Sequence, residues 1–135
     1  MDGAKIWDPL RRKWVAHTPE EEVRQWFVGV LRDHLGVPVH LMNSEVSLRF
    51  GAVSWRADIQ VFDRTGKALL TVECKRPEVE LGPETVSQAL RYHLSTPVKY
   101  LCVTNGTKTF FAVRKEGSAF QLMDHAPSYA EMTSI

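Results

Sequence analysis

Apolar side chains recur at helical spacing in two stretches of the chain. In the first, a threonine that can cap a helix and a following proline precede apolar residues three and four apart, which predicts a helix over residues 19–35. In the second, Gly82 and Pro83 open a segment that predicts a helix running to about residue 94. Each helix would present one apolar side for packing.

Short apolar or alternating runs between and after these helices predict β-strands. The runs cover residues 46–50, 57–63, 68–75, 98–104 and 107–113, with a further edge strand at 120–123. Turn-forming residues at 64–67 and at Asn105-Gly106 separate neighbouring strands. The order of elements predicts a fold of class α/β (α+β), in which helices pack against the faces of a mixed sheet.

The length of 135 residues favours one domain. We expect it to span residues 18–125, with a hairpin-like leader at 1–17 packed on it and a loosely ordered tail at 126–135. The leader offers Trp7, Leu10, Trp14 and Val15 for docking. No apolar run is long enough for a membrane helix, and the first ten residues do not resemble a signal peptide, so we expect no membrane partner.

Composition and charge exclude few classes of function. The net charge of +1 neither indicates nor excludes nucleic-acid binding, because acidic site residues can mask a local basic surface. Candidate DNA contacts are Lys5, Arg11, Arg12, Arg76 and Arg91. Two cysteines are too few for a disulfide scaffold, which favours a cytoplasmic location. The Gly-x-x-x-x-Gly-Lys-Ser/Thr loop does not occur, so no nucleotide cofactor is expected.

One group of charged residues lies in otherwise apolar strands. Glu73 and Lys75 project from the same face of their predicted strand, about 6.5 Å apart along it, whereas Cys74 points to the apolar side. Asp58, on the preceding strand, can join that face if the register allows. Two carboxylates can hold Mg²⁺, and a lysine beside them can orient or deprotonate water and neutralise charge on a phosphate. The pattern indicates phosphodiester hydrolysis, although Glu-x-Lys alone is common on solvated strands.

The predicted helices supply further polar side chains. Gln88 and Tyr92 share one helix face, where they either position a reacting group or form a polar face with a half-buried tyrosine. On the first helix, a spacing of 100° per residue places Glu20 on the inward side and Glu21 nearly opposite. An inward carboxylate needs a partner, which could be a metal, a water network or Arg24. Glutamates in a first helical turn are also expected from the helix dipole alone.

The order and spacing of these segments resemble the PD-(D/E)xK nuclease superfamily. The closer resemblance is to the N-terminal nuclease domain of type I restriction enzyme R subunits. It is carried by residues 6–13 with 18–25, 56–59, 72–77, 88–92 and 104–106. The resemblance implies a restriction-endonuclease-like central sheet flanked by helices. The helicase motor that follows this domain in full R subunits does not occur in the chain.

The resemblance also implies roles for individual residues. The site would comprise Asp58, Glu73, Lys75, Gln88, Tyr92 and Glu20, with Glu21 as the alternative to Glu20. Asp58, Glu73 and Glu20 would hold Mg²⁺, for which Mn²⁺ can substitute. The implied function is a metal-dependent DNA endonuclease, acting with other restriction subunits or as a homodimer. Two alternatives stay open: a catalytically silent nucleic-acid-binding or protein-interaction module with the same fold, and an enzyme like a Holliday-junction resolvase.

Overall fold

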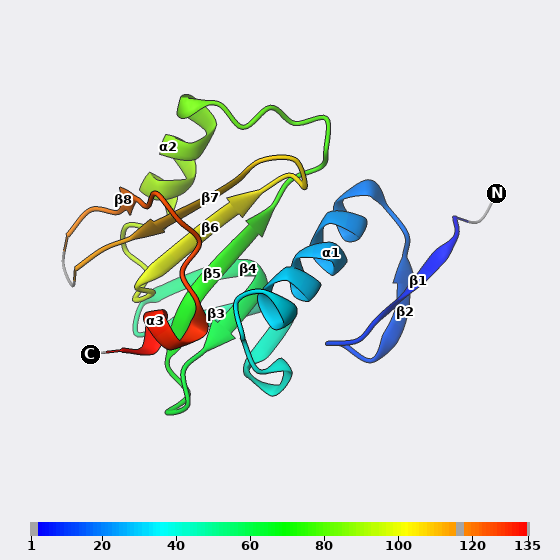
Figure 1. Ribbon diagram of the computed structural model, residues 1–135, viewed down its shortest axis with the longest axis horizontal. Helices are drawn as coiled ribbons and strands as arrows, with labels where there is room; N and C mark the ends of the chain where they lie inside the picture. The colour runs from blue at the N-terminus through cyan, green and yellow to red at the C-terminus, as the bar shows by residue number, and fades with distance from the viewer. Residues whose placement is uncertain (1–2, 116–117, 135) are drawn as a thin grey trace.

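A six-stranded mixed sheet forms the centre of the molecule (Figure 1). The computed structural model describes residues 3–115 and 118–134. The strands are β1 (Lys5–Asp8), β2 (Lys13–Ala16), β3 (Met42–Phe50), β4 (Val53–Phe62), β5 (Ala68–Cys74), β6 (Tyr100–Thr104), β7 (Thr109–Val113) and β8 (Gln121–Leu122). The helices are α1 (Pro19–Asp33), the 3-10 helix η1 (Val39–Leu41), α2 (Pro83–Tyr92) and α3 (Tyr129–Thr133).

The central sheet has the order β3-β4-β5-β6-β7-β8, and β1 and β2 form a separate hairpin. Strands β5 and β6 are parallel, whereas the other neighbouring strands are antiparallel. Parallel neighbours need a crossover connection, and α2 lies within that connection. The predicted mixed sheet with flanking helices is confirmed.

Helix α1 begins where the sequence predicts. The hydroxyl of Thr18 accepts a hydrogen bond from the Glu21 N–H at 3.1 Å, and a proline occupies the first turn. Its apolar side, which includes Phe27 and Leu31, packs with the inner faces of β4 and β5 in the larger core. Neither α1 nor any other helix in residues 3–115 and 118–134 is long and apolar enough to cross a membrane.

The other face of the sheet is covered by α2 and the segment that contains β8. Ala89 of α2 packs with Leu81 and Val103 in one apolar cluster. A second cluster joins Trp55 to Phe120 and to residues of β6 and β7. The central strands are thus buried on both faces, and a buried polar pair there, Gln60 and Thr71, is joined by a hydrogen bond of 2.6 Å.

Two expectations from the sequence are corrected by the structure. Strands β3 and β4 form a longer hairpin than residues 46–50 and 57–63 predict, because β3 already begins at Met42 and β4 at Val53. Met42 and Trp55 are buried in these added parts, so the strands alternate between core and solvent over a longer stretch than the apolar residues alone indicate. The segment expected to be a loose tail forms α3. The Tyr129 hydroxyl donates a hydrogen bond to the carbonyl of Phe62 at 3.0 Å, and Met132 is buried in the core. This packing holds the segment in place.

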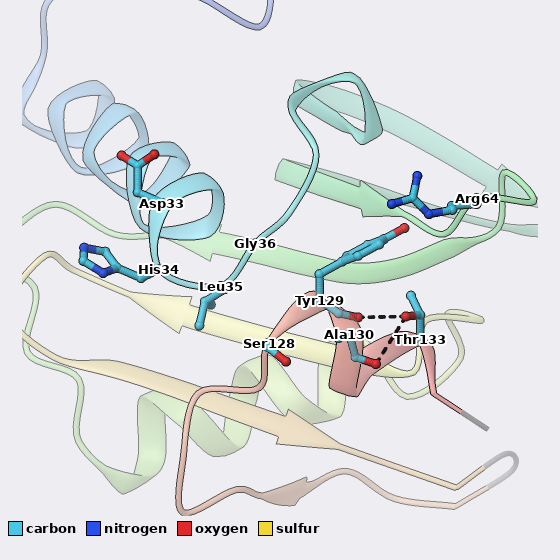
Figure 2. Close-up of a pocket in the computed structure, with 9 residues that line it drawn as sticks. All are labelled: Asp33, His34, Leu35, Gly36, Arg64, Ser128, Tyr129, Ala130 and Thr133. Atoms are coloured by element: carbon cyan, nitrogen blue, oxygen red, sulfur yellow. Dashed lines mark hydrogen bonds between the residues drawn. The ribbon is translucent and has the colours of Figure 1, made fainter.

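An open cavity of about 550 Å³ lies between the end of α1 and α3 (Figure 2). Residues lining it are Asp33, His34, Leu35, Gly36, Arg64, Ser128, Tyr129, Ala130 and Thr133. They come from the carboxyl end of α1 and the residues that follow it, from the turn before β5, and from α3 with its N-cap. The charged residues singled out by the sequence lie at the other end of β5, so this cavity is separate from the candidate site.

Candidate active site

Asp58 meets β5 at the point where β4 and β5 separate. The register of the two strands ends at Ile59 opposite Val72. Beyond it, the backbone N–H of Cys74 donates to Oδ2 of Asp58 at 2.6 Å, so a carboxylate takes the place of a strand carbonyl. The carboxyl of Asp58 is therefore fixed against the backbone between Glu73 and Lys75.

Glu73 and Lys75 share a face of the chain at the end of β5, as the alternation predicts. Lys75 Nζ lies 2.7 Å from Oε2 of Glu73, and the two side chains are 34% and 26% exposed. Cys74 points to the other face of the sheet, where it packs with Val72 in the larger core beneath α1. The structure thus brings Asp58, Glu73 and Lys75 together at the carboxyl end of a buried strand.

His93 contacts the same glutamate from the end of α2. Its side chain is 1% exposed, and Nε2 lies 3.7 Å from Oε1 of Glu73, beyond hydrogen-bond range. Its Nδ1 is buried without a hydrogen-bond partner, and its ring meets the edge of Tyr92. Sequence reasoning did not place His93 in the candidate site. The available signal was its position four residues after Ala89 on the packing side, where a polar ring needs a partner.

Glu45 adds another carboxylate, and sequence reasoning missed it. The β3–β4 register pairs Ser44 with Ile59 and Val46 with Ala57, which leaves Glu45 across from Asp58. Its φ of 49° is in the left-handed region, which costs energy for a residue with a side chain. No sequence signal marks such a position. We refer to Asp58, Glu73, Glu45 and Lys75 as the acidic cluster.

The pKa values of Asp58 and Glu73 are shifted in opposite directions from the ordinary values of these carboxyls. Burial, together with the charges of Glu45, Glu20 and Glu73, raises the pKa of Asp58 to about 6, despite the hydrogen bond from Cys74. For Glu73, the proximity of His93 and then of Lys75 outweighs burial and lowers the pKa to about 2. The hydrogen bond to Glu73 raises the pKa of Lys75. Lys75 is therefore an ammonium at neutral pH.

The first-helix carboxylates do not point as the sequence predicts. Glu20 is exposed, although its charge is close enough to raise the pKa of Asp58. Glu21 is buried and pairs with Arg24, so the expected inward position of Glu20 is wrong, and Arg24 is not its partner. The physical reason is a tertiary contact. Asp8 of the hairpin lies beside the guanidinium that pairs with Glu21, with Oδ2 of Asp8 3.4 Å from Nη2 of Arg24.

Asp8, Arg11, Glu21 and Arg24 form a buried ionic network, which we call the anchor network. Arg11 contacts both carboxylates, with Nη2 3.4 Å from Oε1 of Glu21. Arg24 also donates to the hydroxyl of Ser44 at 2.6 Å. The network joins the β1–β2 hairpin to α1 and β3. Arg11, a candidate DNA contact, is thus half-buried and paired with carboxylates of the protein.

Gln88 and Tyr92 are both exposed on α2, Tyr92 at 64%. Among the hydrogen bonds and ion pairs of the described residues, neither reaches Asp58, Glu73 or Lys75. The half-buried tyrosine that the sequence favours is corrected to an exposed one, whose ring packs on His93. Any effect of Tyr92 on the acidic cluster passes through His93.

The remaining cationic candidates lie on the surface. Arg76 pairs with Glu78 at 2.7 Å, next to the end of β5. Lys5, Arg12 and Arg91 are exposed, the first two on the hairpin and the third on α2. They form no single basic surface around the acidic cluster.

A divalent cation fits the donor chemistry of the acidic cluster. Its carboxylate oxygens are ligands that Mg²⁺ prefers, and burial, with a smaller effect of the neighbouring carboxylates, raises the pKa of Asp58. In the ranges 3–115 and 118–134, no three His, Cys, Asp or Glu side chains form a complete metal-binding group. The cluster therefore offers a partial ligand set, to which Mg²⁺, a cation that retains several waters, is suited.

Comparisons with known proteins bear on the family of the chain. The family model for the type I restriction enzyme R protein N terminus (HSDR_N) matches residues 19–127. No curated protein matches the chain. Among solved structures, the chain is similar to a candidate nuclease belonging to DUF820 from Anabaena variabilis ATCC 29413, with 14% identity, a TM-score of 0.47, and coverage of 93% of this chain and 79% of that one. Because the family model spans most of its length, the chain belongs to the type I restriction enzyme R protein N-terminus family.

Proposed function

We propose that the protein is a Mg²⁺-dependent endonuclease that hydrolyses phosphodiester bonds in DNA. Membership of a restriction-enzyme family supports a nuclease-type function. The observation that carries the proposal is the convergence of Asp58, Glu73 and Lys75 where β4 and β5 separate. DNA as substrate, and other restriction subunits as partners, follow from the family as part of the same proposal.

The carboxylates and the lysine of the site have different roles in this proposal. Asp58 and Glu73, with Glu20 nearby, would hold Mg²⁺, because they present oxygen donors and excess negative charge. When bound, Mg²⁺ polarises a phosphoryl oxygen and lowers the pKa of a coordinated water. Lys75 stands beside these carboxylates as an ammonium, so it donates hydrogen bonds and stabilises negative charge that develops on the phosphate.

His93 and Cys74 hold the two carboxylates in position. The buried imidazole of His93 lies against Glu73 and restricts where its carboxylate can point. The backbone N–H of Cys74 does the same for Asp58. Groups that hold metal ligands in place affect activity through the ligands rather than by touching substrate.

A plasmid-nicking assay tests the proposal. Supercoiled DNA is incubated with Mg²⁺ or Mn²⁺, and in parallel with EDTA, using the parent protein and Glu73→Gln. We expect nicking that requires the metal and is lost in Glu73→Gln. Glu80→Gln, which changes an exposed glutamate on the loop before α2, is the matched control and should nick like the parent.

Calorimetric titration with Mn²⁺ separates the enzyme from a silent binding module. We expect the parent to bind Mn²⁺ and Glu73→Gln to bind it more weakly. A parent protein that neither nicks DNA nor binds Mn²⁺ would instead be a non-catalytic module. Branched DNA offered beside linear DNA tests whether the enzyme acts like a junction resolvase.

A further inference from the structure

The outer face of the β1–β2 hairpin carries two exposed tryptophans side by side. Trp7 and Trp14 are register partners, and their rings meet edge to face with centroids 5.6 Å apart. They are 44% and 62% exposed. Large aromatic side chains are highly buried on average, so an exposed pair marks a surface available to a partner.

The inner face of the same hairpin is fixed to the domain. Asp8 is fully buried in the anchor network, and Ile6 and Val15 are half-buried. Because neighbouring strand residues point to opposite faces, the burial of Asp8 directs Trp7 outward. Figure 1 shows the hairpin beyond α1, away from the central sheet. The two indoles therefore stand on an anchored surface.

The hairpin also concentrates positive charge. Residues 3–17 contain four basic residues and one acidic residue, although the whole chain has a net charge of only +1. The acidic residue is Asp8, which the anchor network neutralises. Lys5 lies two residues before Trp7, and Arg12 lies two before Trp14. Both are exposed, and within the described part of the chain neither forms an ion pair. Unneutralised cations thus flank the aromatic pair.

We propose that this surface, the tryptophan platform (Lys5, Trp7, Arg12 and Trp14), binds the unpaired nucleotides of a single nucleic-acid strand. Bases stack on aromatic rings whatever their sequence, and flanking cations bind phosphates. In a duplex the base faces are stacked on one another, so a duplex engages only the cations. A second copy of this chain would bring the same positive charges to the interface, which disfavours self-association through this face.

The position of the platform links it to the acidic cluster. The hairpin leads directly into the first turn of α1, and its Asp8 contacts Arg24. Arg24 lies close enough to Glu45 and Cys74 for their charges to affect its pKa. The anchor network thus lies between the hairpin and the acidic cluster. Any part of the platform in presenting DNA for cleavage rests on the proposed function, whereas the binding of a single strand does not.

Fluorescence anisotropy of a labelled mixed-sequence oligonucleotide tests the platform. The single strand and its duplex are titrated with the full chain in EDTA, so that cleavage does not contribute. We expect tighter binding of the single strand and a loss of about tenfold or more in Trp14→Ala, from the loss of base stacking. Trp14→Phe should retain most of the affinity. Trp26→Ala, which removes a 47% exposed tryptophan of α1, is the matched control and should bind like the parent.

A second variant tests the platform without altering its aromatic pair. Lys5→Gln should reduce the slope of log affinity against log salt by about one phosphate contact. Circular dichroism establishes that each variant is folded. Equal parent affinity for the two DNA forms, or equal losses in Trp14→Ala and Trp26→Ala, would overturn the proposal. So would self-association in sedimentation that Trp14→Ala alone abolishes, because a second copy would then be the occupant.

These results are separable from those for the nuclease. Selective single-strand binding in a protein that fails to nick DNA supports the platform and refutes only the nuclease. Metal-dependent nicking without such binding refutes only the platform.

Discussion

Two groups of carboxylates near the first turns of α1 differ in how their charge is neutralised. In the anchor network, Asp8 and Glu21 each meet an arginine, and both carboxylates are buried. In the acidic cluster, Lys75 neutralises Glu73, while Asp58 faces other negative charges. In the anchor network, two arginines balance the charge of two carboxylates. In the acidic cluster, the charge of Lys75 does not balance all the carboxylates, so a cation can bind there.

The pKa values of the two aspartates express this difference. Burial opposes ionisation of Asp8, but hydrogen bonds from Arg11 and Leu10 and the charge of Arg24 lower its pKa overall. Burial and neighbouring carboxylates raise the pKa of Asp58. An aspartate with a lowered pKa stabilises the fold when ionised, whereas one with a raised pKa destabilises it. The comparison indicates that the anchor network serves folding and the acidic cluster serves chemistry.

The largest expected effect is on activity, in the acidic cluster. Lys75→Ala removes the ammonium beside the reacting phosphate, so the nicking rate should fall about 10²- to 10⁴-fold. Stability should change little, because the side chain is one-third exposed. Initial nicking rates and a thermal melt measure the two quantities. Lys99→Ala, an exposed lysine before β6, should leave both unchanged. A variant as active as the parent would remove Lys75 from the mechanism.

The anchor network should respond in the opposite way. Arg24→Met leaves Asp8 and Glu21 buried with less compensation, and breaking a buried ion pair costs about 3–5 kcal/mol of unfolding free energy. Urea denaturation measures the loss. Arg32→Met, on the exposed side of the same helix, should cause no measurable change. Equal stability of the two variants would contradict a structural role for the network.

The sequence predicts the acidic cluster better than it predicts the anchor network. Asp58, Glu73 and Lys75 lie on strands whose alternation can be read locally, and two successive strands pair as neighbours. The roles of Glu20 and Glu21 could not be assigned from helical spacing alone. Which glutamate turns inward depends on Asp8, and its approach to Arg24 is a tertiary contact.

The same distinction applies to the fold. Helix α1 and strand β5 are close to their predicted bounds, because caps, prolines and apolar runs define them locally. Helix α3 was missed, because its order comes from contacts of Tyr129 and Met132 with distant elements. Glu45 was missed for a related reason, since its backbone conformation follows from the β3–β4 register.

A smaller effect on stability should appear at Asp58. In EDTA, its pKa of about 6 against an ordinary 3.8 means that the folded protein retains a proton that the unfolded chain has lost. Stability therefore falls as pH rises through this window, and the deficit is complete above about pH 6. Asp58→Asn removes the deficit and can still accept from Cys74, so it should be more stable than the parent by about 1–2 kcal/mol at neutral pH.

The pH series supplies its own control. Well below pH 3.8, the ordinary pKa of an aspartate, Asp58 is protonated in both states, so the gain from Asp58→Asn should vanish. Asp63→Asn should show the opposite sign, because hydrogen bonds from Thr65 and Lys67 outweigh burial and lower the pKa of Asp63. Denaturant titrations at acidic and neutral pH provide the measurement. A gain independent of pH would show that the charge of Asp58 is not its source.

The smallest effects should separate His93 from Tyr92. His93 lies against Glu73, and loss of a partner that orients a metal ligand typically costs about tenfold or more in metal affinity. His93→Gln should therefore weaken Mn²⁺ binding and nicking by about tenfold. Tyr92→Phe keeps the ring that packs on His93 and removes only an exposed hydroxyl, so it should change neither.

Calorimetry with Mn²⁺ and nicking rates, measured on both variants, decide between two accounts of α2. If Tyr92→Phe impairs the enzyme more than His93→Gln, the exposed face of α2 contacts the substrate directly. If His93→Gln has the larger effect, α2 acts through its buried side, by holding Glu73 in place. The contact between His93 and Glu73 favours the second account, since no described hydrogen bond or ion pair joins Tyr92 to the acidic cluster.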